Sequence, residues 1–163
     1  MDVLVCFSKA RCRFKLASTV NQLVENRPYS HVYLKFVLMN VVMVAQASHG
    51  YVNFISFEKF DKENETIYTY RLFCDNDYFT KTVLSKIFRL LGSKYSYSQL
   101  ALIAIKKLFK FEINWYNKSK YFICSEFAAL VCKSLGVIYD EKQDYITPSD
   151  LEQILKDNGV SKI

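Results

Sequence analysis

The chain has 163 residues, of which 51% are hydrophobic and 16% aromatic, and it carries a formal net charge of +6. This composition excludes a disordered chain, and the length predicts one domain, residues 1–163, with a substantial core. The positive charge favours anionic partners only weakly, because scattered basic residues are usually a solvated surface.

Basic residues gather near the N-terminus, at Lys9, Arg11, Arg13 and Lys15. This cluster is a candidate contact for an anionic surface such as phospholipid headgroups. Nucleic acid is not an expected partner, because no zinc-finger spacing or arginine-rich helix accompanies the cluster. The most apolar run, 34–47, is interrupted by polar residues and is too short for a transmembrane segment.

Five cysteines, an odd number without the spacing of a disulfide framework, stand at Cys6, Cys12, Cys74, Cys124 and Cys132. The N-terminus opens with Asp2 and reaches Lys9 within a few residues, so no signal peptide is expected. We therefore expect free thiols in a reducing, cytoplasmic compartment, and neither a metal nor a cofactor.

Five strands are predicted from apolar and alternating patterns, over residues 2–7, 29–38, 41–47, 51–57 and 66–73. A modest amphipathic helix over 14–25 separates the first two strands, and a charged loop over 60–65 precedes the fifth. Because the last four strands follow one another closely, we expect them to form an antiparallel meander.

The remainder of the chain is predicted to be helical. One helix, capped at Asp75 to Asp77, runs through Leu91 and ends at Gly92, and another covers 97–109. A polar connection over 111–120 leads to a helix that begins at Cys124. The last helix runs to about residue 156, and its first residues are Thr147 as N-cap, Pro148 and Asp150. A sheet followed by helices in one domain predicts the α+β class.

Cys124 stands between an apolar run, 121–123, and the helical pattern that follows it. In the first turn of a helix, unpaired N–H groups and the helix dipole favour negative charge, so the pKa of this thiol is expected to fall to roughly 3.5–7.5. The alternative is a structural cysteine, because Cys124 shares an apolar stripe with Ala128 and Val131. Cys132, two turns further on, lacks the helix-end advantage and is expected in the core.

The predicted strand 29–38 alternates strictly, with Val32, Leu34, Phe36 and Leu38 on one face. His31 lies on the other, less apolar face and should contact whatever covers the second side of the sheet. A histidine within hydrogen-bond reach of a thiol can remove its proton and later protonate the leaving group.

Five short stretches along the chain are YSHVYL (29–34), VAQA (44–47) with Gly50 and Phe60 after it, LGSKYSY (91–97), FICSEF (122–127) and TPSDL (147–151). In this order they resemble the circularly permuted branch of the papain-like (NlpC-type) amidase superfamily, the branch that includes YiiX-like proteins. The resemblance spans most of the chain and implies a permuted papain-like fold with a cysteine nucleophile at Cys124 and a histidine base at His31.

The resemblance also implies a polar residue from the next strand that orients His31. That residue is usually acidic, Asn or His, whereas this chain has Gln46 at the matching position, a departure from the pattern. Gln46 lies inside a predicted strand and can point at a neighbouring strand, whereas His49 lies in a turn, so we expect Gln46 to orient His31.

Three residues are candidates for substrate binding: Tyr29, Tyr97 and Ser125. The tetrahedral oxyanion can be held by the backbone N–H of Cys124 or of its neighbour Ser125. Either tyrosine can donate a hydrogen bond or line the substrate slot, with plain aromatic packing as the alternative.

Three functions follow from this resemblance. The first is a thiol hydrolase that cleaves an amide bond in a peptide or a cell-wall-type substrate. The second is an acyltransferase or lipase on lipid esters with the same dyad, as in the lecithin retinol acyltransferase-like relatives. The third is a binding or inhibitory module that keeps the fold without turnover, which the departure at Gln46 motivates.

Overall fold

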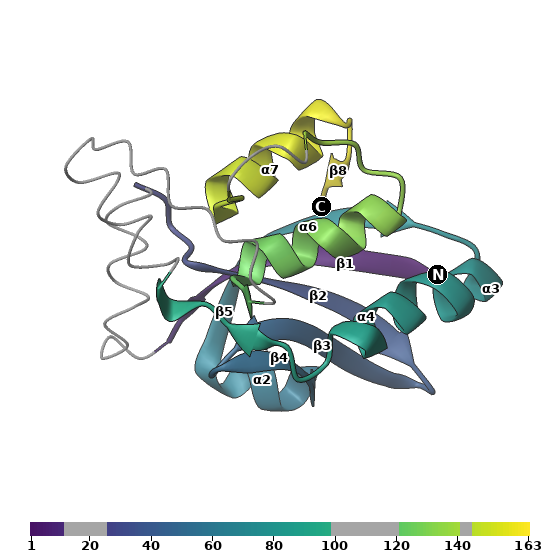
Figure 1. The fold of residues 1–163 in the computed structure, drawn as a ribbon, viewed down its shortest axis with the longest axis horizontal. Helices are drawn as coiled ribbons and strands as arrows, with labels where there is room; N and C mark the ends of the chain where they lie inside the picture. The colour runs from purple at the N-terminus through teal and green to yellow at the C-terminus, as the bar shows by residue number, and fades with distance from the viewer. Residues whose placement is uncertain (12–25, 99–120, 141–144) are drawn as a thin grey trace.

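The computed structural model describes residues 1–11, 26–98, 121–140 and 145–163. Within these residues one sheet contains eight strands (Figure 1), all antiparallel to their neighbours except the pair formed by β6 and β7. Across the sheet the strands lie in the order β7 (Tyr121–Phe122), β6 (Lys94–Tyr95), β4 (Tyr51–Ser56), β3 (Val41–Ser48), β2 (His31–Leu38), β1 (Asp2–Ala10), β5 (Asn64–Phe73) and β8 (Ser161–Lys162).

The five predicted strands are confirmed, with small differences at their ends, but the predicted meander is wrong in its last step. β2, β3 and β4 are consecutive neighbours, whereas β5 pairs with β1 instead of β4. The pairing with β1 extends from Asp2 opposite Phe73 to Ala10 opposite Asn64. Toward the other edge of the sheet, β6 pairs with the side of β4 that does not pair with β3. The hydrogen bonds that β5 forms along the whole of β1 therefore decide its position in the sheet, although β4 is closer in sequence.

The charged segment around Phe60, predicted as a loop, forms the short helix α2 (Phe57–Glu63). Ser56 caps this helix by accepting a hydrogen bond from the N–H of Lys59. The Phe60 side chain is buried, and its ring centroid lies 4.2 Å from that of Tyr33 on β2. Burial of this aromatic pair gives the helix the tertiary support that a two-turn segment needs.

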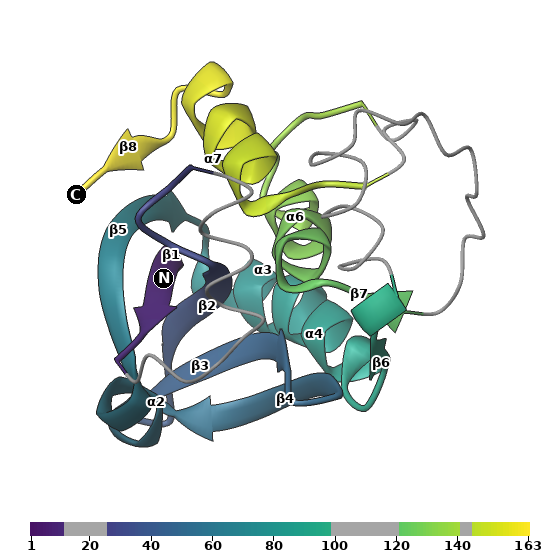
Figure 2. The same cartoon turned by 90° about the vertical axis from the view of Figure 1, so that its left-hand side faces the viewer.

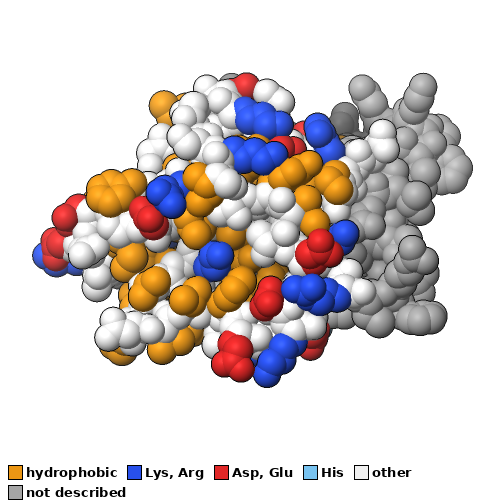
Figure 3. Space-filling model, turned by 180° about the vertical axis from the view of Figure 1, so that it is seen from behind, with side chains coloured by type: hydrophobic (Ala, Val, Ile, Leu, Met, Phe, Trp, Pro, Cys, Tyr) orange, Lys and Arg blue, Asp and Glu red, His pale blue; other side chains and the backbone are white. Residues whose placement is uncertain are grey.

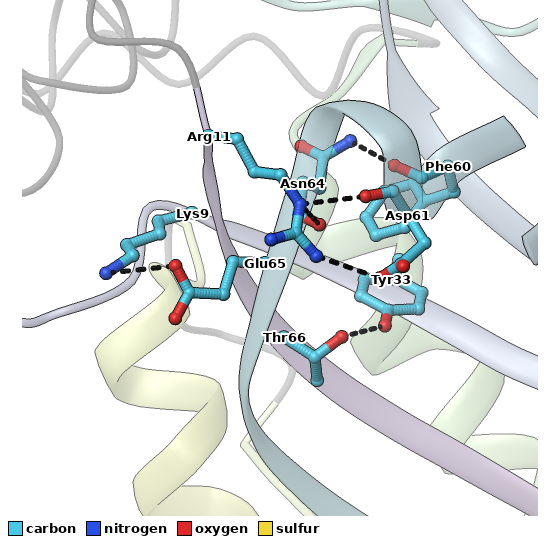
Figure 4. Close-up of polar contacts among 8 residues, drawn as sticks. All are labelled: Lys9, Arg11, Tyr33, Phe60, Asp61, Asn64, Glu65 and Thr66. Atoms are coloured by element: carbon cyan, nitrogen blue, oxygen red, sulfur yellow. Dashed lines mark hydrogen bonds and ion pairs between the residues drawn. The ribbon is translucent and has the colours of Figure 1, made fainter. Parts of the chain in front are cut away.

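Polar contacts attach the end of β1 to α2 and β5 (Figure 4). The Arg11 side chain donates to the backbone carbonyls of Asp61 and Asn64, over 2.9 and 3.1 Å, and pairs with the Asp61 carboxylate. Lys9 pairs with Glu65 at 3.3 Å. Of the four basic residues predicted to contact an anionic surface, Lys9 and Arg11 are thus already paired with carboxylates. The other two lie outside the described residues.

The face of the sheet opposite to α2 is covered by helices. They are α6 (Cys124–Ser134), α7 (Pro148–Asp157) and a continuous helical stretch formed by α3 (Asn76–Tyr78), the π-helical η1 (Phe79–Leu84) and α4 (Ser85–Leu90). Figure 2 shows α2 on one side of the sheet and α6 and α7 on the other. Asp75 caps the composite stretch, and Gly92 follows it with φ of +76°, as predicted. The π-helical segment within it was not predicted.

The main core lies between this helical layer and the sheet. Apolar side chains from alternate strand positions meet one stripe of each helix, as in the buried cluster of Val5, Val32, Leu34, Phe127, Val131, Leu151 and Leu155. The predicted start of the last helix is confirmed, because Thr147 and Asp150 form a capping box with Pro148 in the first turn. Predicted segments 14–25, 111–120 and most of 97–109 lie outside the described residues.

Candidate active site

The N-terminus of α6 is fixed by the strand that precedes it. β7 leads through the buried Ile123 directly to Cys124, the first residue of the helix. A carboxylate oxygen of Glu126 accepts a hydrogen bond from the N–H of Ile123 over 3.0 Å. This contact satisfies a backbone donor at the helix entry and gives the first turn a defined geometry.

The thiol of Cys124 contacts β2 near the end of its pairing with β3. Their pairing ends with Leu34 opposite Ala45, although β2 begins at His31 and β3 continues to Ser48. α6 packs against both strands, and the backbone N–H of Val32 hydrogen-bonds to the Cys124 sulfur. The sulfur therefore contacts β2 at the residue that follows His31.

The expected low pKa of Cys124 is wrong for the folded chain as described. Its side chain is only 3% exposed, and burial raises the pKa of the thiol to about 11. Hydrogen bonds from the N–H groups of Val32 and Ser125 lower this pKa, and the nearby Glu126 carboxylate raises it. Desolvation of the thiolate thus outweighs the stabilisation that the helix start provides.

The imidazole of His31 contacts the side chain of Gln46, with 2.8 Å between Nε2 and Oε1. A carbonyl oxygen can only accept, so the proton of this hydrogen bond belongs to Nε2 of the histidine. In the neutral ring, Nδ1 is then the acceptor nitrogen. The ring also lies 6.3 Å from that of Phe60, on the α2 side of the sheet, which agrees with the predicted less apolar face.

His49 has a different position from Gln46. It lies in the two-residue turn beyond the last pair of β3 and β4, is exposed, and adopts a left-handed φ of +53°. Its Nδ1 contacts the hydroxyl of its neighbour Ser48 over 3.0 Å. The predicted contact with His31 is thus made by Gln46.

Asn53 on β4 supports Gln46 and was missed by sequence reasoning. Nε2 of Gln46 donates to Oδ1 of Asn53 over 3.4 Å, and Nδ2 of Asn53 donates to the carbonyls of Ser48 and Tyr51. The signal was present in the sequence. A two-residue turn that pairs Ser48 with Tyr51 necessarily places Gln46 opposite Asn53.

Two predicted substrate-binding side chains are inaccessible. Tyr29 is fully buried and donates to the carboxylate of Glu152 over 2.6 Å, as Tyr70 does over 3.0 Å. The Ser125 hydroxyl is buried and donates to the carbonyl of Ile146 over 2.5 Å. Both side chains attach the C-terminal segment to the core, so neither is available to contact a substrate, whereas the predicted oxyanion contact of Ser125 concerns its backbone N–H at the start of α6.

Tyr97 lies at the surface, 58% exposed, with its ring centroid 4.9 Å from that of Tyr95. Tyr95 pairs with Phe122 across β6 and β7, two residues before Cys124. Burial, followed by the proximity of Cys124, raises the pKa of Tyr95. Tyr95 was also missed, and it connects the candidate nucleophile with the exposed Tyr97.

Ser8 on β1 lies opposite His31 in the sheet register. Its side chain is fully buried, and its hydroxyl has no hydrogen-bond partner, which holds for no other buried side-chain nitrogen or oxygen in the described part of the chain. An unpaired buried hydroxyl costs free energy, so Ser8 is a notable polar group at the register position opposite His31.

No protein-family model matches the sequence, and no curated protein matches it. A solved structure is similar in fold: the crystal structure of the metalloprotein YiiX from Escherichia coli O157:H7. The two chains are 17% identical with a TM-score of 0.58, and the similarity covers 96% of this chain and 79% of that one. This likeness shows an α+β fold shared with YiiX.

YiiX is described as a metalloprotein, a property without a counterpart in the described residues of this chain. Among them, no three His, Cys, Asp or Glu side chains are grouped so that they could hold a metal ion.

No helix in residues 1–11, 26–98, 121–140 or 145–163 has the length and apolar character that crossing a membrane requires.

Proposed function

We propose that this chain is a cysteine hydrolase of the permuted papain-like fold that cleaves an amide bond in a peptide or a cell-wall-type substrate. In this proposal Cys124 is the nucleophile, His31 is the general base and Gln46 orients the imidazole. The observation that carries it is the 2.8 Å contact between His31 Nε2 and Gln46 Oε1, because it leaves Nδ1 as the base at the strand end that the Cys124 sulfur contacts.

In this proposal the reaction begins with transfer of the Cys124 proton to Nδ1 of His31 across the end of β2, where the sulfur accepts from the N–H of Val32 and the pairing with β3 has ended. The thiolate attacks the amide carbonyl carbon, and a C–S bond forms while the carbonyl oxygen becomes an oxyanion near the N–H groups at the start of α6. Collapse of this intermediate breaks the C–N bond, and the imidazolium gives its proton to the leaving amine. His31 then activates water, which hydrolyses the thioester and restores the thiol.

The high pKa of Cys124 defines the task of His31. An isolated thiol with a pKa of about 11 would be ionised in roughly one molecule in ten thousand at pH 7. Proton transfer to a neighbouring imidazole replaces an isolated buried anion with an ion pair, which is much less costly. The proposed nucleophile is thus formed together with its base.

A second function is favoured by the same burial. With a thiol only 3% exposed, a binding or inhibitory module that retains the fold without turnover also fits. A lipid-ester acyltransferase would use the same dyad and differs from the amidase only in its substrate.

The test is turnover of a panel of amide and ester substrates by the wild-type chain and by Cys124→Ala. The matched control is Cys132→Ala, which removes a buried thiol from the same helix. We expect amide cleavage that Cys124→Ala abolishes and Cys132→Ala retains per folded molecule. Preferential ester turnover would identify the acyltransferase alternative, and a folded wild type without turnover would identify the binding module.

A further inference from the structure

We propose that Asn53 is a positioning residue that selects the tautomer of His31, an inference that rests on the proposed function. A chain of hydrogen bonds leads from two backbone carbonyls at the β3–β4 turn, through Asn53 and Gln46, to the imidazole. The direction of each bond in this chain is fixed by the chemistry of the group before it.

The first step is the orientation of the Asn53 amide. The carbonyl oxygens of Ser48 and Tyr51 can only accept hydrogen bonds, and they lie 3.1 and 3.3 Å from one end of the Asn53 side chain. The NH₂ group must occupy that end, because Oδ1 there would face two acceptors without a donor. Oδ1 of Asn53 therefore points toward Gln46.

The second step is the orientation of the Gln46 amide, which is 4% exposed and thus has little access to water. Oδ1 of Asn53 accepts, so the NH₂ group of Gln46 must face it, which places Oε1 against His31. In the flipped amide, oxygen would face oxygen at Asn53, and the NH₂ group would face the imidazole.

The third step is the tautomer. With Oε1 of Gln46 as acceptor, Nε2 of His31 carries the proton, and Nδ1 is the basic nitrogen in the neutral ring. A flipped Gln46 would donate to Nε2 and favour the tautomer protonated at Nδ1, in which the remaining basic nitrogen, Nε2, is occupied by Gln46. The backbone at the turn therefore sets, through two amides, which nitrogen acts as the base.

The 3.4 Å contact between Gln46 and Asn53 is long for a hydrogen bond, so it biases the amide rather than locking it. Loss of a neutral hydrogen bond of this kind should change the tautomer ratio by about 3- to 10-fold. The rate of thiol activation should fall by no more than this factor, because the rate follows the fraction of the one tautomer that can act as the base.

The test compares two variants by the ¹⁵N chemical shifts of the imidazole nitrogens and by turnover. Asn53→Leu removes both the acceptor for Gln46 and the donor to the turn. Asn53→Asp retains an acceptor for Gln46 but loses the donor, so both variants should melt at lower temperature. The chain has two histidines, and the signals of His31 are assigned by their loss in His31→Ala.

Asn158 provides the stability control, since its amide donates to the carbonyls of Ile138 and Ile154 at the far end of α7. We expect Asn53→Leu to shift the tautomer ratio of His31 about 3- to 10-fold toward Nδ1–H and to lower turnover by at most the same factor. Asn53→Asp should retain the Nε2–H tautomer and most of the turnover, and Asn158→Leu should change stability alone.

Unchanged His31 shifts in Asn53→Leu, or equal loss of the tautomer in Asn53→Asp, would overturn the inference, because a merely structural residue would affect both variants alike. These shifts are read without substrate. If the wild-type chain turns over nothing, the proposed function fails, while the shifts still decide the role of Asn53.

Discussion

Cys124 and Cys132 lie on the same helix, α6, and both are almost completely buried. Burial raises the pKa of Cys124 to about 11 and that of Cys132 to about 12. The two thiols are nearly equivalent in burial and in their position on the buried face of the helix. Neither burial nor acidity therefore identifies a nucleophile in this chain.

The difference lies in the groups around each sulfur. Cys132 belongs to the main apolar core, whereas Cys124, at the first residue of the helix, receives hydrogen bonds from the N–H groups of Val32 and Ser125. The strand it contacts carries His31, whose imidazole is hydrogen-bonded to Gln46. A buried thiol thus becomes a candidate nucleophile through the groups that surround it. Variants of those groups should therefore separate Cys124 from Cys132.

Removal of the base should have the largest effect. We expect His31→Ala to lower amide turnover by about 10²–10⁴-fold, the usual contribution of general-base catalysis, with only a small loss of stability because the ring is partly exposed. Turnover per folded molecule and thermal melting together measure this. The exposed His49→Ala is the control and should retain turnover; collapse of melting with normal residual turnover would make His31 structural.

Removal of the orienting group should have a smaller effect. Gln46→Ala should lower turnover about 10-fold, because the imidazole loses its hydrogen-bond acceptor. Gln46→Glu should retain or raise turnover, since a carboxylate stabilises the imidazolium more than an amide does. Steady-state rates of the two variants decide the point, and equal losses in both would show that the Gln46 side chain acts only in packing.

A change at Glu126 should sharpen the contrast between the two thiols. The Glu126 carboxylate raises the pKa of Cys124 but is not among the groups that act on Cys132. Glu126→Gln should therefore increase the alkylation rate of Cys124 at pH 8 by about 2- to 5-fold and leave Cys132 unchanged. Mass spectrometry after timed labelling measures both rates; acceleration at both sites would indicate general opening of the helix.

The same variant should change how stability depends on pH. Burial raises the pKa of Glu126 from 4.5 to about 7, so the folded state favours the protonated carboxyl. Its stabilising contribution is present below pH 4.5 and is lost as the pH rises through 7. Glu126→Gln should match the wild type at pH 4 and be about 1–3 kcal/mol more stable at pH 8, as measured by denaturant unfolding. Equal pH dependence would contradict this.

Much of the fold could be predicted because its signals are local. Alternation gave the strands that carry His31 and Gln46, and capping residues such as Asp75 and Thr147 gave helix starts. The partner of β5 could not be predicted, since a pairing between β1 and β5 depends on contacts more than fifty residues apart. The helix around Phe60 was missed because, besides its Ser56 cap, it depends on the packing of Phe60 against a ring on β2.

In the candidate site, too, the features set by local sequence could be predicted and those set by distant contacts could not. The contact of His31 with Gln46 follows from neighbouring strands and was predicted, whereas the pKa of Cys124 depends on how completely α6 and the sheet exclude water, which no local pattern records. Tyr29 was predicted to line the substrate slot because it lies close to His31 in sequence, and Ser125 because its backbone N–H follows Cys124. Their partners, Glu152 and Ile146, lie far along the chain.

The most direct measurement is the alkylation rate of Cys124 relative to Cys132 between pH 6 and 10, in the wild type and in His31→Ala. If Cys124 and His31 work as a pair, Cys124 reacts well ahead of Cys132 at pH 7 in the wild type. In His31→Ala its reactivity moves to high pH, toward the pKa of about 11 that burial imposes. Identical profiles for Cys124 in the two proteins would contradict the pair and leave Cys124 a buried core thiol like Cys132.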